Sequence, residues 1–134
     1  NSVDNLILGS RWPTETDFKQ LIRFFKRFDK NVIIIGNAQE FYDVPTLYFK
    51  RGNNINNFAK NFNKDIFKVN EKIKLAAKQT QIHFFDKSLL NCNLKCVVFS
   101  GNTLLYSDRD HWSYDGFEYF GKRIYLSDFN KLLR

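Results

Sequence analysis

Apolar and polar positions alternate along the chain in a way that predicts strands and helices in turn. Short apolar runs predict buried strands at Val3–Gly9, Asn31–Gly36 and Gln81–Phe85. The second run is a continuous β-branched stretch, which is typical of a parallel strand covered on both faces. Apolar side chains at intervals of three and four predict one amphipathic helix with its N-cap at Thr14 and another that starts at Asn57. The order strand, helix, strand indicates a βαβ unit and an α/β fold.

The last third of the chain contains shorter predicted elements. A turn at Gly101-Asn102 between two short apolar runs predicts a small hairpin over residues 96–106. Helical patterns follow at Ser113–Phe120 and Ser127–Leu133, separated by Gly121–Tyr125. We therefore expect two short helices after the hairpin.

Composition indicates a folded chain. The 134 residues are 43% hydrophobic and include 15 Phe, which is sufficient for one hydrophobic core. We therefore expect a folded chain and not a disordered one. No apolar run approaches the roughly 18 residues of a membrane span, and no signal peptide is visible at Asn1. We expect a soluble chain that is a fragment or a processed segment.

Charge adds little to the functional picture. The chain has 21 Lys and Arg against 14 Asp and Glu, a net charge of +7. These basic residues are scattered, with no run of five or more, so a solvated face is favoured over a nucleic-acid patch. We expect no nucleic acid among the partners.

Two cysteines, Cys92 and Cys96, are separated by three residues. With only one histidine in the neighbourhood they lack the ligands for a zinc site, and we expect no bound metal. The spacing leaves two alternatives, a pair of free thiols or a disulfide that closes a short loop.

The segment from Leu105 to Gly116 carries the strongest candidate chemistry. Asp108 precedes His111 by three residues, so its carboxylate can hold the ring N–H and leave the other ring nitrogen free as a base. Asp110 is adjacent in sequence and is expected to point to solvent, and Ser113 is a candidate helix N-cap. The alternative interpretation is a surface turn with solvated acids.

Several sequence blocks occur in an order that resembles a known family. The most specific block is Asp108-x-x-His111-Trp112-Ser113-x-x-Gly116, with Trp112 where the family usually has Leu. The others are Leu6–Trp12, Val32–Gly36, Gln39–Phe41, Asp43–Pro45 and the cysteine pair. Together they resemble the SGNH hydrolase domain that is fused to bacterial membrane-bound acyltransferases which O-acylate surface glycans.

This resemblance implies a fold, a location and residue roles. The fold would be a three-layer α/β/α arrangement with a mainly parallel sheet that lacks its first strand, and residues 1–134 would form one domain that is the C-terminal portion of a larger one. Asp108 and His111 would be the acid and base of a catalytic triad, and Cys92 and Cys96 would form a disulfide. The chain would belong to the periplasm or cell envelope, attached to the inner membrane through an absent segment. Its partners would be an envelope glycan and a membrane-embedded acyltransferase domain of the parent protein.

One departure from the family pattern concerns the nucleophile. The family's Gly-Asp-Ser motif does not occur in the 134 residues. Either the nucleophile lies on a preceding segment, which we favour, or Ser10 after the first strand replaces it. In both cases Ser10, Arg11 and Trp12 would line the cleft beyond a strand end, where ligands bind in open α/β sheets. Whether Arg11 serves as an oxyanion donor stays open, and core packing is the alternative role of Trp12.

The leading hypothesis is acyl transfer to, or hydrolysis from, sugar hydroxyls of an envelope polysaccharide or lipopolysaccharide, most simply of acetyl. His111 would deprotonate a serine while Asp108 orients the ring, and no metal or organic cofactor is needed. This fragment would be inactive alone if the nucleophile lies outside it. The alternative is a non-catalytic glycan-binding or partner-docking remnant that uses aromatic platforms, namely Trp12, Tyr48, Trp112 and Tyr114.

Overall fold

The computed structural model describes residues 4–42, 44, 62–92 and 96–133. Its helices and strands follow in this order: β1 (Asn5–Gly9), α1 (Phe18–Phe25), the 3-10 helix η1 (Lys26–Phe28), β2 (Asn31–Ile35), α4 (Asp65–Thr80), β3 (His83–Phe85), α5 (Ser88–Asn91), β4 (Phe99–Ser100), β5 (Thr103–Leu104), α6 (Tyr114–Leu126) and α7 (Phe129–Leu132).

The central feature is a parallel sheet in the order β1-β2-β3. β1 pairs with β2 from Asn5↔Asn31 to Gly9↔Ile35, and β2 pairs with β3 over three positions. The βαβ unit predicted from the sequence is therefore confirmed. Because the strands are parallel, their carboxyl ends all lie at one edge of the sheet.

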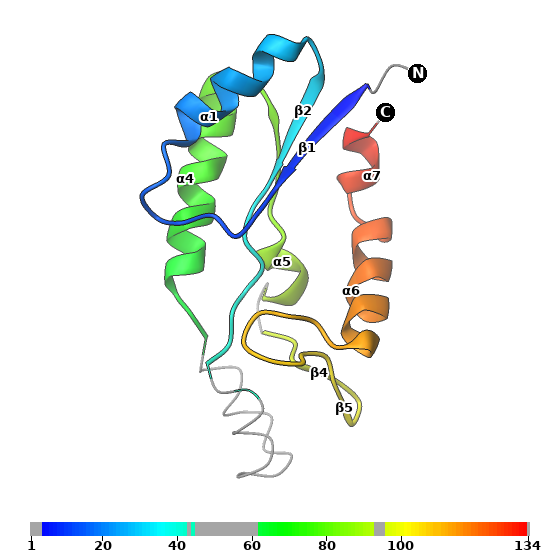
Figure 1. Cartoon of the computed structure of the whole chain (residues 1–134). Coiled ribbons are helices and arrows are strands. Elements are labelled where there is room, and N and C mark those ends of the chain that lie inside the picture. The colour runs from blue at the N-terminus through cyan, green and yellow to red at the C-terminus, as the bar shows by residue number, and fades with distance from the viewer. Residues whose placement is uncertain (1–3, 43, 45–61, 93–95, 134) are drawn as a thin grey trace.

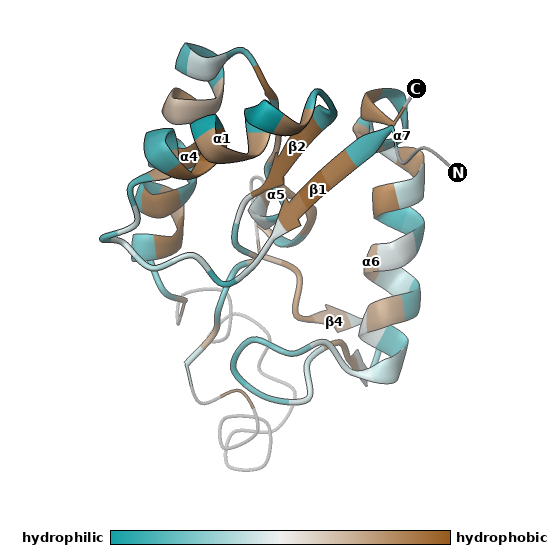
Figure 2. Ribbon diagram, turned by 45° about the horizontal axis from the view of Figure 1, so that its top comes forward, coloured by the Kyte–Doolittle hydropathy of each residue, from teal (hydrophilic) through white to brown (hydrophobic). Residues whose placement is uncertain are grey.

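Side-chain alternation divides the sheet into two faces. Leu8, Val32 and Ile34 are buried against α1 and α4, and Figure 1 shows these two helices lying together on one face. Ile22 of α1 and Ile73 of α4 are fully buried at this contact. Much of β1 and β2 is brown in Figure 2 because apolar side chains of these strands pack against the two helices.

The opposite face is covered by α6 and α7, which completes three layers (Figures 1 and 2). Phe85 of β3 packs against Phe129 of α7 with ring centroids 4.8 Å apart. The side chains of Asn5 and Asn31 donate hydrogen bonds to carbonyls at the end of α7, those of Leu133 and Leu132. The predicted α/β/α arrangement is thus present.

β1 and β3 are the two edge strands of this sheet among the described residues, because each pairs only with β2. Ile7 of β1 is 45% exposed, whereas Ile33, its partner in register on β2, is fully buried. The face of β1 that α6 and α7 should cover is therefore partly open.

Three predicted helix boundaries are wrong. Asp17, not Thr14, caps α1, because its carboxylate accepts from the Gln20 N–H. α4 begins at Asp65 and not at Asn57: Phe62 forms an antiparallel bridge with Phe41, and residues 57–61 lie outside the described part. α6 continues through Gly121–Tyr125, where a break was predicted.

None of the helices among the described residues has the length and apolar character required to cross a lipid bilayer.

Candidate active site

The candidate loop is closed by hydrogen bonds at its base. The Ser107 N–H donates to the His111 carbonyl, the Ser113 N–H donates to the Leu105 carbonyl, and Tyr106 and Trp112 form an isolated bridge. The Tyr106 ring is fully buried against Phe41, with centroids 4.9 Å apart. A buried aromatic residue therefore fixes the start of a loop whose tip is exposed.

Asp108 binds His111 as the spacing predicted. The Asp108 carboxylate oxygens lie 2.9 and 3.0 Å from His111 Nδ1, whereas the nearer Asp110 oxygen lies 3.6 Å away. Asp108 Oδ1 also accepts from the backbone N–H groups of His111 and Asp110, at 2.9 and 3.0 Å. The prediction that Asp108 rather than Asp110 hydrogen-bonds the ring is confirmed, while the catalytic roles of Asp108 and His111 stay predictions.

Electrostatics favour the ionised forms of this pair. The His111 backbone N–H, with weaker help from the Asp110 N–H and the His111 ring, lowers the pKa of Asp108. The Asp108 hydrogen bond and then the charges of Asp108 and Asp110 raise the pKa of His111, and the charge of Arg11 opposes them. Nε2 of His111 has no hydrogen-bond partner among the described residues, and the side chain is 74% exposed. This nitrogen is open to a reacting group.

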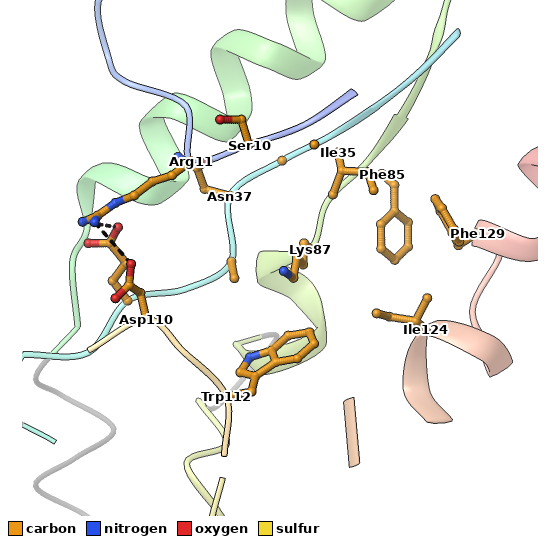
Figure 3. A pocket seen from close by; sticks show the side chains of 14 residues that line it. Ser10, Arg11, Ile35, Asn37, Phe85, Lys87, Asp110, Trp112, Ile124 and Phe129 are labelled. Atoms are coloured by element: carbon orange, nitrogen blue, oxygen red, sulfur yellow. Dashed lines mark ion pairs between the residues drawn. The ribbon is translucent and has the colours of Figure 1, made fainter. Parts of the chain in front are cut away.

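A pocket of about 400 Å³ lies beside the loop, beyond the carboxyl ends of the strands. Ser10 and Arg11 from the end of β1 and Asp110 and Trp112 from the loop line it (Figure 3). Lys87 projects into its centre and its ammonium lies 4.5 Å from the centroid of the Trp112 ring. Burial lowers the pKa of this lysine.

Ser10, Arg11 and Trp12 have different surroundings. Ser10 is exposed, and no described residue hydrogen-bonds it, His111 included. Both terminal nitrogens of Arg11 contact acids, those of Glu40 and Asp110. Trp12 is a packing residue, since Nε1 donates to the Ile35 carbonyl and its ring meets Phe18 edge-on.

Sequence reasoning missed two residues that organise this edge of the sheet. Asn37 accepts from the Trp12 N–H and donates to the Trp12 carbonyl, which fixes the turn after β1. Glu40 is buried and binds both Arg11 and Arg109. No sequence spacing indicates either role, because each residue binds a partner about 25 or more positions away in the sequence. The only sequence feature that pointed to Glu40 was its place in the block Gln39–Phe41 that resembles the family.

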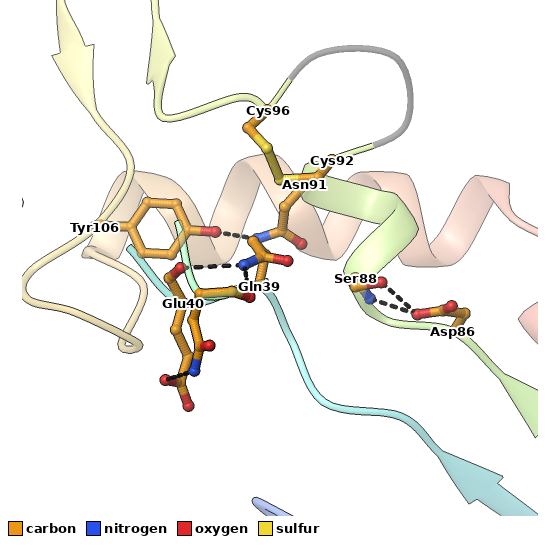
Figure 4. The surroundings of a disulfide bond; sticks show 9 residues. Gln39, Glu40, Asp86, Ser88, Asn91, Cys92, Cys96 and Tyr106 are labelled. Carbon is orange, nitrogen blue, oxygen red and sulfur yellow. Dashed lines mark hydrogen bonds between the residues drawn. A yellow bond between two sulfur atoms is a disulfide. The ribbon is translucent and has the colours of Figure 1, made fainter. Parts of the chain in front are cut away.

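The cysteine pair is a disulfide between Cys92 and Cys96. The two residues form an antiparallel bridge at the end of α5, beside Asn91, whose side-chain amide donates to the Tyr106 hydroxyl (Figure 4). The disulfide implied by the family resemblance is therefore present. The disulfide thus lies next to Asn91, which hydrogen-bonds Tyr106 at the start of the candidate loop.

Metal binding is not assigned to the loop. Asp108, Asp110 and His111 offer ligand atoms within 4.8 Å of one another. Their contacting atoms already pair with each other, with backbone N–H groups or with Arg11, and exposed acids of this kind commonly occur without an ion.

The aromatic platforms of the alternative hypothesis are mostly used for packing. Trp12 and Trp112 are engaged in the core or against Phe120, Tyr48 lies outside the described residues, and Tyr114 is 85% exposed. Only Tyr114 of the four is thus an open platform among the described residues.

Comparisons with known proteins agree with this architecture. The structure is similar to the periplasmic domain of a lipopolysaccharide acetyltransferase of Salmonella ser. Paratyphi A, with a TM-score of 0.64 and 18% identity. The match covers 97% of this chain and 56% of that one, so the chain spans about half the length of this neighbour. No curated protein matches the sequence at a significant level. A family model described as "SGNH domain (fused to AT3 domains)" matches residues 1–125, and the chain belongs to this family.

Proposed function

We propose that this chain is part of an enzyme that transfers an acyl group, most simply acetyl, to or from sugar hydroxyls of a bacterial envelope polysaccharide or lipopolysaccharide. The observation that carries the proposal is the Asp108 carboxylate on His111 Nδ1 with Nε2 left open. Family membership and the name of the structural neighbour, a lipopolysaccharide acetyltransferase, support the reaction class.

The proposed chemistry is serine acyl transfer. His111 Nε2 accepts the serine proton as the serine oxygen attacks the acyl carbonyl carbon, and the imidazolium then returns that proton to the leaving group. In the second half, a sugar hydroxyl or water gives its proton to Nε2 as its oxygen attacks the acyl carbonyl carbon, and the imidazolium returns that proton to the serine oxygen as the acyl bond to serine breaks. Asp108 keeps the proton of the neutral ring on Nδ1 and stabilises the imidazolium, and backbone N–H groups stabilise the oxyanion.

We place the nucleophile on a segment outside this chain, on a strand that pairs with the free edge of β1. No hydrogen bond joins Ser10 to His111, which argues against Ser10 as the nucleophile. A strand added at the edge of β1 would end beside Gly9 and the pocket, because parallel strands end at the same side of the sheet. It would also cover the exposed Ile7.

The same proposal includes the parent protein and its location. A membrane-embedded acyltransferase domain in the parent, attached through a segment outside this chain, would place the site in the periplasm near the inner membrane. The disulfide Cys92–Cys96 fits an oxidising compartment. The envelope glycan would then be the partner of the site.

The test uses the chain extended by the upstream segment of its parent. Hydrolysis of p-nitrophenyl acetate and acetyl transfer to purified lipopolysaccharide are measured for His111→Ala and for His83→Ala. Loss of a general base should lower the rate about 10²- to 10⁴-fold for His111→Ala. His83→Ala is the matched control, because His83 is exposed on β3, lies outside the candidate loop and has no carboxylate partner for its ring among the described residues.

Full activity of His111→Ala would overturn the proposal and leave the loop with a structural role. An extended protein that is inactive but retains glycan would favour the non-catalytic alternative.

A further inference from the structure

Three segments that are distant in sequence meet at the carboxylate of Glu40. Oε1 lies 2.9 Å from Arg11 Nη2, and Oε2 lies 2.7 Å from Arg109 Nη2 and 3.1 Å from Asn63 Nδ2. The Glu40 side chain is only 5% exposed. Both carboxylate oxygens are thus satisfied by donors from the turn after β1, the candidate loop and the segment before α4.

Burial makes this ion pair different from an ordinary surface pair. Exposed salt bridges usually contribute about 0–1 kcal/mol, since solvent screens them and the side chains lose entropy. A buried carboxylate instead needs its partners, because leaving it unpaired is strongly destabilising. Glu40 therefore holds the Arg11 guanidinium in a fixed place even though the Arg11 side chain is 60% exposed.

The other end of the Arg11 guanidinium contacts the candidate loop. Arg11 Nη1 lies 3.2 Å from Asp110 Oδ2, and Asp110 Oδ1 lies 3.6 Å from His111 Nδ1. Asp110 is therefore placed between a cation and the imidazole. Figure 3 shows its ion pair with Arg11. The charged groups around His111 are Asp108 and Asp110 of its own loop, Arg11 beyond Asp110, the Glu40–Arg109 pair behind Arg11, and Lys87 against the adjacent Trp112.

We infer that Arg11, anchored by Glu40, is a positioning residue for His111: it holds the Asp110 carboxylate away from Nδ1, so that Asp108 alone orients the ring. Without Arg11, Asp110 is free to move the remaining distance to Nδ1 and to compete with Asp108. Two unbalanced carboxylates at one ring would over-stabilise the imidazolium and reduce the fraction of neutral base. The catalytic consequence rests on the proposed function, but the placement of His111 does not.

The first measurement needs only the present chain. With two histidines in the sequence, NMR can follow both imidazoles through a pH titration, in the presence of a chelator so that no divalent cation contributes. Arg11→Gln should raise the pKa of His111, because the charge that opposes Asp110 is gone. Arg23→Gln on α1 is the matched control: it makes the same change in net charge and should leave both imidazoles unchanged.

Two further variants separate positioning from a simple change of charge or a folding defect. Arg11→Gln is therefore compared in two backgrounds: a direct charge effect would raise the pKa of His111 by the same amount with Asp110→Asn present, whereas positioning through Asp110 predicts no further rise there. Asp110→Asn alone leaves the Arg11–Glu40 pair intact and should lower the pKa of His111, so it tests the inference even if Arg11→Gln unfolds. An unchanged titration of His111 in folded Arg11→Gln or in Asp110→Asn, or an equal rise from Arg11→Gln in both backgrounds, would overturn the inference.

An activity measurement on the extended protein distinguishes this inference from the proposed function. If both hold, the acidic limb of the kcat/KM profile for p-nitrophenyl acetate moves to higher pH in Arg11→Gln and not in Arg23→Gln. A shifted His111 titration in a protein without acyl transfer would uphold the positioning role and reject the function. An active enzyme in which Arg11→Gln changes neither the His111 titration nor the pH profile would uphold the proposed function and reject the positioning role.

Discussion

Asp108 accepts hydrogen bonds from three donors of its own loop, the backbone N–H groups of Asp110 and His111 and the His111 ring. The two backbone bonds fix the carboxylate before the ring binds it, so the side chain of an exposed histidine acquires a defined orientation. Local spacing is sufficient for this arrangement, since all the groups lie within four residues. This is why the pair was predictable from the sequence.

Asp108→Asn should therefore lower the pKa of His111 more than Asp110→Asn does, because the Asp108 hydrogen bond is the largest cause of the raised value. In the extended protein, the acidic limb of kcat/KM should move to lower pH while the maximal rate falls, since an amide neither stabilises the imidazolium nor ensures the correct tautomer. The imidazole titration by NMR checks the first statement and a pH–rate profile the second. Equal shifts from the two variants would contradict the assignment of Asp108 as the orienting acid.

At the scale of elements, the start of α6 is built against the candidate loop. Ser113 Oγ accepts from the Gly116 N–H and donates to the Leu104 carbonyl, so one hydroxyl caps the helix and ties it to β5. A Cβ on Gly116 would overlap the Leu105 carbonyl oxygen and approach its carbon to 2.9 Å. The glycine that closes the family block thus permits close contact between helix and loop.

Gly116→Ala should lower the free energy of unfolding by about 1–3 kcal/mol, because the added methyl group forces the helix and loop apart. Gly121→Ala on the same helix is the matched control: nothing lies within 4 Å of its Cβ, and Ala has the better helix propensity, so stability should rise by up to about 1 kcal/mol. Urea unfolding of the two variants measures both effects. A Gly116→Ala protein as stable as the wild type would show that the contact at Leu105 relaxes without cost.

At the scale of the whole molecule, β1 has one unpaired edge among the described residues. An open parallel edge with an exposed Ile7 invites a further strand, and such edges are ordinarily covered or blunted. α1 and α4 already cover one face of β1, whereas the other face lies partly open.

Hydrogen exchange can test whether a further strand covers this edge. In the present chain, the β1 amides that point away from β2 should exchange much faster than those of β2, which has strands on both sides. In the protein extended by its upstream segment, these β1 amides should become protected while those of β2 change little. Equal exchange of the β1 amides in the two proteins would mean that the added segment does not pair there.

The sequence by itself determined the features that depend on near neighbours. The βαβ unit follows from the apolar run at Asn31–Gly36 and the helical spacing before it, and the Asp108–His111 pair follows from a separation of three. Tertiary structure decided where partners come from distant segments. Phe62 leaves the predicted helix because it bridges Phe41, and Trp12 packs in the core because Ile35 offers a carbonyl for its Nε1. The ion pairs of Arg11 with Glu40 and Asp110 join the turn after β1, the segment after β2 and the candidate loop. Only the folded sheet brings these three segments together, so no local sequence pattern could have encoded the ion pairs.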